Sequence, residues 1–350
     1  MIAAAPTPRV AIVLVNWNGW RDTLECLSSV FGSEAADVAD VYLVDNASTD
    51  GSVQRIVAWC ADPEPFGAYQ AFEGVRHVGR EPIPCRIWQA NGQAMPDASR
   101  ARLNVVESGS NLGFAGGNNV GIVAAGLHRY SHFWLLNTDT VIRRDALTRL
   151  LERAAANLGV GMVGSTLRYY NEPHLIQAMG GARLDERTAI PTHIADRCPI
   201  EQLPVDVTAV EQQMAYVVGA SMLVSREFVQ RVGLMQEDYF LYYEEVDWAF
   251  RARPYFKLGY APLSMVYHKV GASSTQVMSE YSLNVRYRSR VRFTSRFLPA
   301  SLPSVRRMLA LEVVRHILKG RWMPARLAAR TLRDSRKLAA SARPVQRSTP

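Results

Sequence analysis

The stretch Val10-Ala-Ile-Val-Leu-Val15 is an uninterrupted run of apolar residues, most of them β-branched. Such a run predicts a strand buried on both faces, as in a parallel sheet. Residues 20–31 follow with apolar side chains at helical spacing, and Val41-Tyr-Leu-Val44 is a second short buried strand. This strand–helix–strand order predicts a doubly wound, mostly parallel α/β sheet.

Further elements extend this pattern along the chain. Strands are predicted at residues 103–106, 133–136 and 216–224, and helices at residues 145–157 and 226–232. Residues 62–102 carry five prolines and scattered aromatic side chains, which predict an irregular insertion at the sheet periphery with room for one hairpin. Beyond residue 160 the pattern predicts short strands and loops.

Composition limits the class of protein. With 350 residues and 48% apolar content, the chain can bury a substantial core, and its net charge of +8 favours an anionic partner. The four cysteines are far apart and form no CxxC pair, so reduced thiols are expected. No apolar run reaches about 18 residues and no signal-peptide pattern is present, so we expect a cytoplasmic protein without a membrane span.

Polar residues follow four of the predicted strands: Asn16 and Asn18, then Asp45, then the segment Asn111-Leu-Gly-Phe-Ala-Gly-Gly-Asn-Asn119, then Asp139. Each aspartate taken alone is more often a helix cap or part of an Asx-turn. In an open α/β sheet, however, the carboxyl ends of the strands form the ligand site, and four polar strand ends on one edge predict such a site.

The chemistry of these residues fits a nucleotide diphosphate. Asp45 can accept hydrogen bonds from a nucleobase or ribose, and glycines at 113, 116 and 117 would let the backbone approach a phosphate or sugar. Asp139 offers oxygen ligands for Mg²⁺ or Mn²⁺, which would neutralise a diphosphate. The segment matches neither GxGxxG nor the P-loop, so dinucleotide and P-loop binding are disfavoured.

Five segments then occur in a fixed order. They are Val13-Leu-Val-Asn-Trp-Asn-Gly19, Val44-Asp-Asn-Ala-Ser-Thr-Asp-Gly-Ser52, Asn111–Asn119, Leu136-Asn-Thr-Asp-Thr140 and Phe240-Leu-Tyr-Tyr-Glu-Glu-Val-Asp-Trp-Ala-Phe-Arg251. Together they resemble the family 2 glycosyltransferases of the GT-A fold, most closely the rhamnosyltransferase-like branch, over roughly residues 9 to 296. The resemblance implies inverting transfer of a sugar from a nucleotide-diphosphate donor, with dTDP-rhamnose expected, to a glycan or lipid-diphosphate-linked acceptor in cell-surface polysaccharide synthesis.

The resemblance also assigns roles to residues of this chain. Asp139 and His268 would hold the metal, and Asn137 replaces the first aspartate of the usual DxD motif, which leaves the number of protein ligands open. His268 alone is also compatible with a hydrogen-bonded core residue. Donor contacts are expected from Val15, Asn16, Asn18, Asp45, Asn111, Gly113, Gly116, Asn118, Asn137 and Thr138.

The catalytic base is expected within residues 242–247. Glu245 is the preferred base, but Glu244 stays open, because helical spacing puts Glu244 and Asp247 on one face and Glu245 elsewhere. Asp247 is expected to support the helix, pairing with Arg251 four residues later. An acidic helix start favoured by the helix dipole is the alternative for this cluster. Trp17 and Trp248 could stack on a base or sugar, although core packing is preferred for both.

The predicted domain division follows these motifs. A GT-A domain covers residues 1–285, with a nucleotide-binding half (9–157, including the insertion 62–102) and an acceptor and catalytic half (158–285). A basic helical extension (286–342) and a tail (343–350) complete the chain. Basic amphipathic helices are typical of peripheral membrane contacts, but a solvated helix pair or a homo-oligomer contact explains them equally well.

Three other functions were weighed. A non-catalytic nucleotide-sugar-binding or scaffold protein could share the fold, but the acidic pair disfavours it. A sugar nucleotidyltransferase would need a Gly-rich loop with a basic residue after the first strand, which the chain lacks. Nucleic-acid binding rests on charge alone, without an accompanying motif, and is not expected.

Overall fold

The computed structural model of the chain describes residues 9–34, 38–66, 72–96, 101–203, 206–269 and 280–341. Its strands are β1 Val10–Asn16, β2 Ala39–Asp45, β3 Cys85–Gln89, β4 Leu103–Glu107, β5 His132–Leu136, β6 Thr140–Ile142, β7 Val160–Tyr169, β8 Ile176–Met179, β9 Gly181–Asp185, β10 Ile190–His193, β11 Tyr216–Val217, β12 Ser221–Ser225 and β13 Lys257–His268. Its α-helices are α1 Trp20–Phe31, α2 Ser52–Ala61, α3 Gly113–Ala125, α4 Ala146–Ala155, α5 Val207–Gln213, α6 Arg226–Val232, α7 Glu244–Ala252, α8 Glu280–Phe297, α9 Leu302–Leu318 and α10 Trp322–Ser341.

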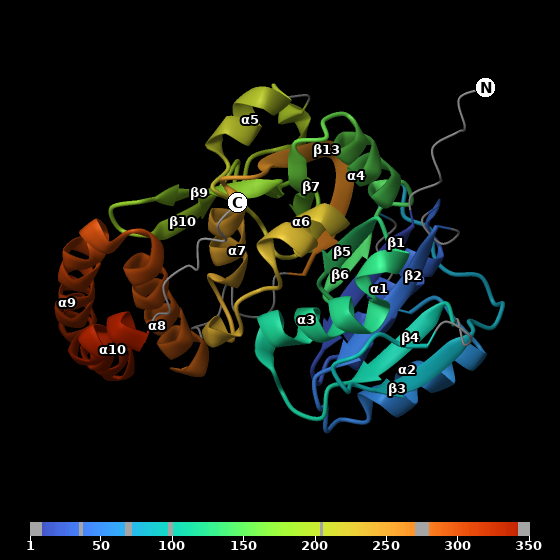
Figure 1. Ribbon diagram of the computed structural model, residues 1–350, viewed down its shortest axis with the longest axis horizontal. Coiled ribbons are helices and arrows are strands. Elements are labelled where there is room, and N and C mark those ends of the chain that lie inside the picture. Colours follow the sequence, from blue (N-terminus) through green and yellow to red (C-terminus); the bar gives the residue numbers. More distant parts are fainter. Residues whose placement is uncertain are drawn as a thin grey trace.

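A mixed, mostly parallel sheet forms the centre of the molecule, in the order β3-β4-β2-β1-β5-β12-β7-β13-β6 (Figure 1). Strands β3, β4, β2, β1 and β5 are all parallel to their neighbours in this row, whereas β12 runs antiparallel to β5 and β7. The first strand alternates between two cores, with Ile12 facing one and Val13 facing the other. The predicted strand buried on both faces is therefore confirmed.

Helices cover both faces of this sheet. Apolar residues of α1, α2 and α4 pack on one face, and those of α3, α5 and α6 pack on the other. This arrangement leaves the carboxyl ends of β1, β2, β4 and β5 along one edge, which is where the polar segments of the sequence begin.

Two sequence predictions were wrong in detail. The insertion 62–102 contains no hairpin among its described residues; β3 instead adds a parallel edge strand beside β4. An edge strand forms backbone hydrogen bonds on one side only, so Pro82 and Pro84, just before β3, do not prevent its pairing with β4. The stretch 216–224 is two strands, because a turn at Gly219 separates β11, which joins β9 in a small sheet, from β12 in the main sheet.

The helices α8, α9 and α10 gather at one end of the molecule, beside α7 and the β9–β10 hairpin (Figure 1). They share one apolar core with α7, to which Val246, Phe250, Val291, Phe293 and Val305 contribute. The basic extension therefore packs against the helix that carries the acidic motif. Across the described segments, no helix is long and apolar enough to cross a membrane.

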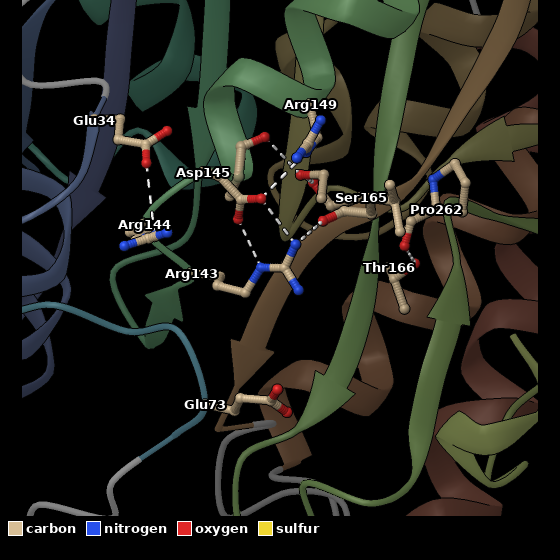
Figure 2. A network of polar contacts seen from close by, with 12 residues as sticks. Glu34, Glu73, Arg143, Arg144, Asp145, Arg149, Ser165, Thr166 and Pro262 are labelled. Atoms are coloured by element: carbon tan, nitrogen blue, oxygen red, sulfur yellow. Dashed lines mark hydrogen bonds and ion pairs between the residues drawn. The ribbon is translucent and has the colours of Figure 1, made fainter. Parts of the chain in front are cut away.

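The corner between β6 and α4 is fixed by charge pairs. Figure 2 shows Asp145 between two arginines: Arg143 Nε donates to Oδ1 at 2.6 Å and Arg149 Nε to Oδ2 at 3.1 Å. Arg143 also donates to the Leu263 carbonyl oxygen at 3.0 Å. These bonds hold the chain directly after Asp139 against β13.

Candidate active site

The loops after β1 and β2 are tied to each other. Asn16 Nδ2 donates to Asp45 Oδ1 at 2.8 Å, while the Ser48 backbone N–H donates to Asp45 Oδ2 at 2.9 Å. Asn18 Oδ1 accepts from the Thr49 N–H at 2.7 Å. Asp45 is only 4% exposed, so its observed contacts are with the protein, and direct contact with a nucleobase stays a prediction.

The glycines of α3 are closely packed against other parts of the protein. A Cβ at Gly113, whose φ is +70°, would lie 2.2 Å from the Phe240 carbonyl oxygen, and a Cβ at Gly116 would lie 2.6 Å from Leu112 Cβ. Asn118 is buried and donates to the Phe114 carbonyl oxygen within the helix. These contacts account for the small residues at this helix start, and contact of Gly113, Gly116 and Asn118 with a sugar donor stays a prediction.

Other residues predicted to contact the sugar donor form hydrogen bonds along this edge of the sheet. Asn111 Oδ1 accepts from the Gly113 N–H at 3.0 Å at the start of α3. Thr138 Oγ1 donates to the Val15 carbonyl oxygen at 3.4 Å, which joins the ends of β5 and β1. Trp17 on this edge is 58% exposed, so the expected core packing was wrong for Trp17; it was right for Trp248, which is fully buried.

Asp139 and His268 meet at the sheet edge. Asp139 lies between β5 and β6, and His268 ends β13, which pairs antiparallel with β6 so that His268 faces Thr140. The two side chains approach to 3.3 Å between Oδ1 and Nε2. Burial alone would raise the pKa of Asp139, but the adjacent His268 outweighs it and holds that pKa below its ordinary value. A turn at residues 138–139 precedes strand β6, so a strand and not a helix follows Asp139.

This pair fits a divalent cation. Gln177 Oε1 lies 2.9 Å from His268 Nδ1 and fixes the ring with Nε2 facing the Asp139 carboxylate. A carboxylate oxygen and an imidazole nitrogen that face each other could both become ligands of one divalent cation. No cluster of three acidic, histidine or cysteine ligands occurs within the described ranges, so a metal here would take its other ligands from a diphosphate or water.

The acidic pair begins α7 after a strained turn. Phe240, Tyr242 and Tyr243 have φ values of 63°, 65° and 73°, a conformation that costs free energy for residues other than glycine. Glu244 is 3% exposed, and the Oε2 atoms of Glu244 and Glu245 have no hydrogen-bond partner among the described residues. Burial and the neighbouring Glu245 raise the pKa of Glu244 well above its usual value, and burial raises the pKa of Glu245 to about 7.

Asp247 plays a supporting part. It is fully buried and accepts hydrogen bonds from Tyr239 Oη at 2.9 Å and from Arg251 Nε at 2.7 Å. Arg296 of α8 forms a further ion pair with it. The expected pairing with Arg251 is confirmed, and Asp247 does not line the cleft described next.

One cleft of about 480 Å³ brings the predicted groups together. Its wall includes Asn137 and His268 from the sheet edge and Glu244 and Glu245 from α7, although Asn137 lies more than 100 positions before the other three in the chain. The sequence analysis missed three polar side chains in the same wall, Gln177, His193 and Arg286. None of these belongs to a motif, and only the packing of β8, β10 and α8 places them here. The Gly271 and Ser273 positions after His268 lie outside the described residues.

Comparison with known proteins addresses the fold. No protein family model matches the chain. Over 284 residues the chain is 21% identical to the low-salt glycan biosynthesis hexosyltransferase Agl10 of Haloferax volcanii, covering 80% of this chain and 74% of Agl10. Among solved structures, GalNAc-T7 with UDP, GalNAc and Mn²⁺ matches with a TM-score of 0.57 at 12% identity, over 83% of this chain and 48% of that chain. The fold prediction is confirmed.

A second solved structure matches more weakly. The mannosyltransferase PcManGT from Pyrobaculum calidifontis, in complex with GDP-Man and Mn²⁺, has a TM-score of 0.49 at 15% identity, over 96% of this chain and 87% of that chain.

Proposed function

We propose that the chain is a glycosyltransferase that moves a sugar from a nucleotide-diphosphate donor to an acceptor hydroxyl. The observation that carries this proposal is the cleft that joins His268, beside Asp139, to Glu244 and Glu245, two glutamates with raised pKa values. The sequence likeness to the hexosyltransferase Agl10 supports the same reaction class, and the bound UDP and Mn²⁺ of GalNAc-T7 support a nucleotide-sugar donor with a metal.

In the proposed inverting reaction, Glu245 removes the proton from the acceptor hydroxyl. The acceptor oxygen then forms a bond to the anomeric carbon of the donor from the face opposite the diphosphate. The bond between that carbon and the diphosphate oxygen breaks, and the nucleoside diphosphate leaves with the electron pair. A carboxylate with a pKa near 7 suits a base at neutral pH, whereas burial and the neighbouring Glu245 raise the pKa of Glu244 and favour its neutral form.

Asp139 and His268 would hold Mg²⁺ or Mn²⁺, which would neutralise the charge on the leaving diphosphate. Asn137, in the wall of the same cleft, is fixed by its backbone N–H, which donates to the Ala220 carbonyl oxygen at 3.0 Å. The loops held by Asp45 and Asn18 would bind the nucleoside part of the donor.

The finer specificity rests on the motif resemblance. It favours rhamnose from dTDP-rhamnose as the donor sugar and a glycan or lipid-linked acceptor for cell-surface polysaccharide. A peripheral contact with an anionic membrane through α9 would bring the enzyme to such an acceptor. Exposed Leu318 and Trp322, which lie among basic residues, support that contact.

The test is donor hydrolysis and transfer with a panel of nucleotide sugars, with and without EDTA. We expect turnover of one donor that needs Mg²⁺ or Mn²⁺, and we expect Asp139→Asn to abolish both turnover and Mn²⁺ binding measured by calorimetry. Metal-independent transfer would refute the role of Asp139. Binding of a nucleotide sugar without any turnover would refute the enzyme and favour a binding protein.

A further inference from the structure

A second cavity, of about 270 Å³, lies between α8 and α9. Ile190 of β10 and Tyr243, directly before α7, close one side. The remaining wall is formed by Leu283, Arg286, Tyr287, Arg290, Glu312, Arg315, His316, Lys319 and Arg321.

The charge of this wall is strongly positive. Four arginines and one lysine face a single carboxylate, that of Glu312. Arg290 is buried and donates from Nε to the Thr188 carbonyl oxygen at 2.8 Å. Its Nη1 atom lies 3.6 Å from Glu312 Oε1, so the charges of Arg290 and Glu312 offset each other. Among the described residues, Arg315, Lys319 and Arg321 make no salt bridge, so their charges stay available.

The basic side chains are not needed as hydrogen-bond partners for the last carbonyl groups of α9. The Lys319 and Arg321 backbone N–H groups already donate to the His316 carbonyl oxygen, and the Gly320 N–H donates to that of Ile317. Helix C-termini normally attract cations because such carbonyls lack partners, and here the backbone supplies the partners. The buried Nδ1 of His316 also has no hydrogen-bond partner among the described residues. These donors together are suited to an anion with several oxygens.

The cavity adjoins the proposed active-site cleft. Tyr243 and Arg286 line both spaces, so a ligand held by the basic wall lies next to the cleft that contains Glu244 and Glu245. Tyr243 is fixed because its hydroxyl donates to the Ala189 carbonyl oxygen at 2.6 Å.

Exposed apolar side chains come from the same segment of the chain. We call Leu311, Val314, Ile317, Leu318 and Trp322 the apolar ridge; their exposed fractions run from 42% to 82%. Four residues of the basic wall, at positions 315, 316, 319 and 321, alternate with the ridge along the chain. An anion-binding wall interleaved with exposed apolar residues matches a ligand that has both a phosphate group and a hydrocarbon chain.

We propose that this cavity binds the phosphate or diphosphate group of a lipid-linked acceptor and so places the acceptor sugar in the cleft beside Glu245. The proposal rests on the proposed glycosyltransferase function for the identity of the acceptor. The anion site itself follows from the wall of the cavity.

The test measures binding of geranyl diphosphate, inorganic pyrophosphate and geraniol to the full chain by calorimetry in EDTA. In Arg315→Gln/Lys319→Gln, geranyl diphosphate should bind about tenfold more weakly or worse, because two charge-assisted contacts are lost. The matched control is Arg307→Gln/Arg326→Gln, which removes the same charge from exposed positions outside the cavity wall and should bind as the wild type does.

Equal binding by the cavity variant and the wild type would overturn the proposal, as would an equal loss in the control variant. Pyrophosphate that binds as tightly as geranyl diphosphate would overturn the lipid-linked source, and binding of geraniol alone would overturn the anion site. Hydrolysis of nucleotide sugars by the wild type is measured in parallel. Its absence would refute the proposed function without changing the result for the cavity.

Discussion

Glu244 and Glu245 are adjacent in the chain, yet their side chains lie in different surroundings. Glu244 is almost fully buried, and the neighbouring carboxylate adds to the rise of its pKa. Glu245 is half-buried, and its pKa of about 7 leaves a large ionised fraction at neutral pH. Helical spacing left the choice of base open, and these surroundings favour Glu245.

Replacing Glu245 by Gln should lower kcat for transfer by about 10² to 10⁴, the usual contribution of a general base. Glu244→Gln should lower kcat much less, because the raised pKa of Glu244 favours its neutral form, which the amide resembles. Steady-state transfer assays at saturating donor measure both variants, and unchanged thermal melting serves as the control. A larger loss in Glu244→Gln would move the base to that residue.

The raised pKa of Glu245 also predicts a pH profile. A base must be ionised, so kcat should fall about tenfold for each pH unit below roughly 7 and level off above it. Glu244, His268 and Arg286 line the same cleft as Glu245. The wild-type profile between pH 5 and 9 tests this, and a flat profile through pH 6 would rule out Glu245 as the titrating base.

At the scale of elements, α7 is positioned by its own buried ion pair. The strained turn at Phe240, Tyr242 and Tyr243 aims the helix start at the cleft, and Asp247 joins it to Arg251 and to Arg296 of α8. Asn119 of α3 holds the preceding loop, since its Nδ2 donates to the Met235 carbonyl oxygen at 2.9 Å. The acidic pair is therefore fixed by elements from three parts of the chain.

Asp247→Asn should lower the free energy of unfolding by about 3–5 kcal/mol, because it leaves the mostly buried Arg251 without its carboxylate and Arg296 with only the more distant Asp238. Thermal or urea denaturation measures the change. Asp334→Asn is the control, since its contact with Arg330, 3.9 Å away, is exposed and should contribute about 0–1 kcal/mol. Equal effects of the two substitutions would contradict the supporting role of Asp247.

At the scale of the whole molecule, the bundle α8–α10 completes the active-site half. It lies beside α7 at one end of the molecule (Figure 1). It shares an apolar core with α7 and leaves the apolar ridge exposed. The apolar ridge and the surrounding basic side chains form one surface that is both apolar and positively charged. An anionic membrane attracts a surface of this kind.

We expect the protein to sediment with phosphatidylglycerol vesicles at low salt and to be released at high salt. Leu318→Ser/Trp322→Ser should weaken this binding about tenfold or more, because two large apolar side chains no longer enter the bilayer interface. Leu158→Ser/Leu263→Ser changes equally exposed apolar residues elsewhere and should have no effect. Equal binding to phosphatidylcholine, or equal loss in the control, would refute the membrane contact.

Sequence periodicity determined the N-terminal half of the fold, because a strand buried on both faces and an amphipathic helix each have a local signature. Val10–Asn16 and its neighbouring strands follow that signature. The polar residues that end these strands, such as Asp45 and Asp139, are also visible in the sequence alone. The edge strand β3 has none, because its pairing with β4 depends on residues far along the chain.

Only the tertiary structure decided how the site is assembled. The meeting of Asp139 with His268 depends on β13 pairing with β6, and the placement of Arg286 depends on α8 packing against α7. The close packing at Gly113 and Gly116 has the same cause: a glycine indicates that something approaches closely, and only the fold shows that Phe240 and Leu112 do so here. Local patterns fix which groups are present, whereas contacts between distant segments fix their surroundings and hence their pKa values.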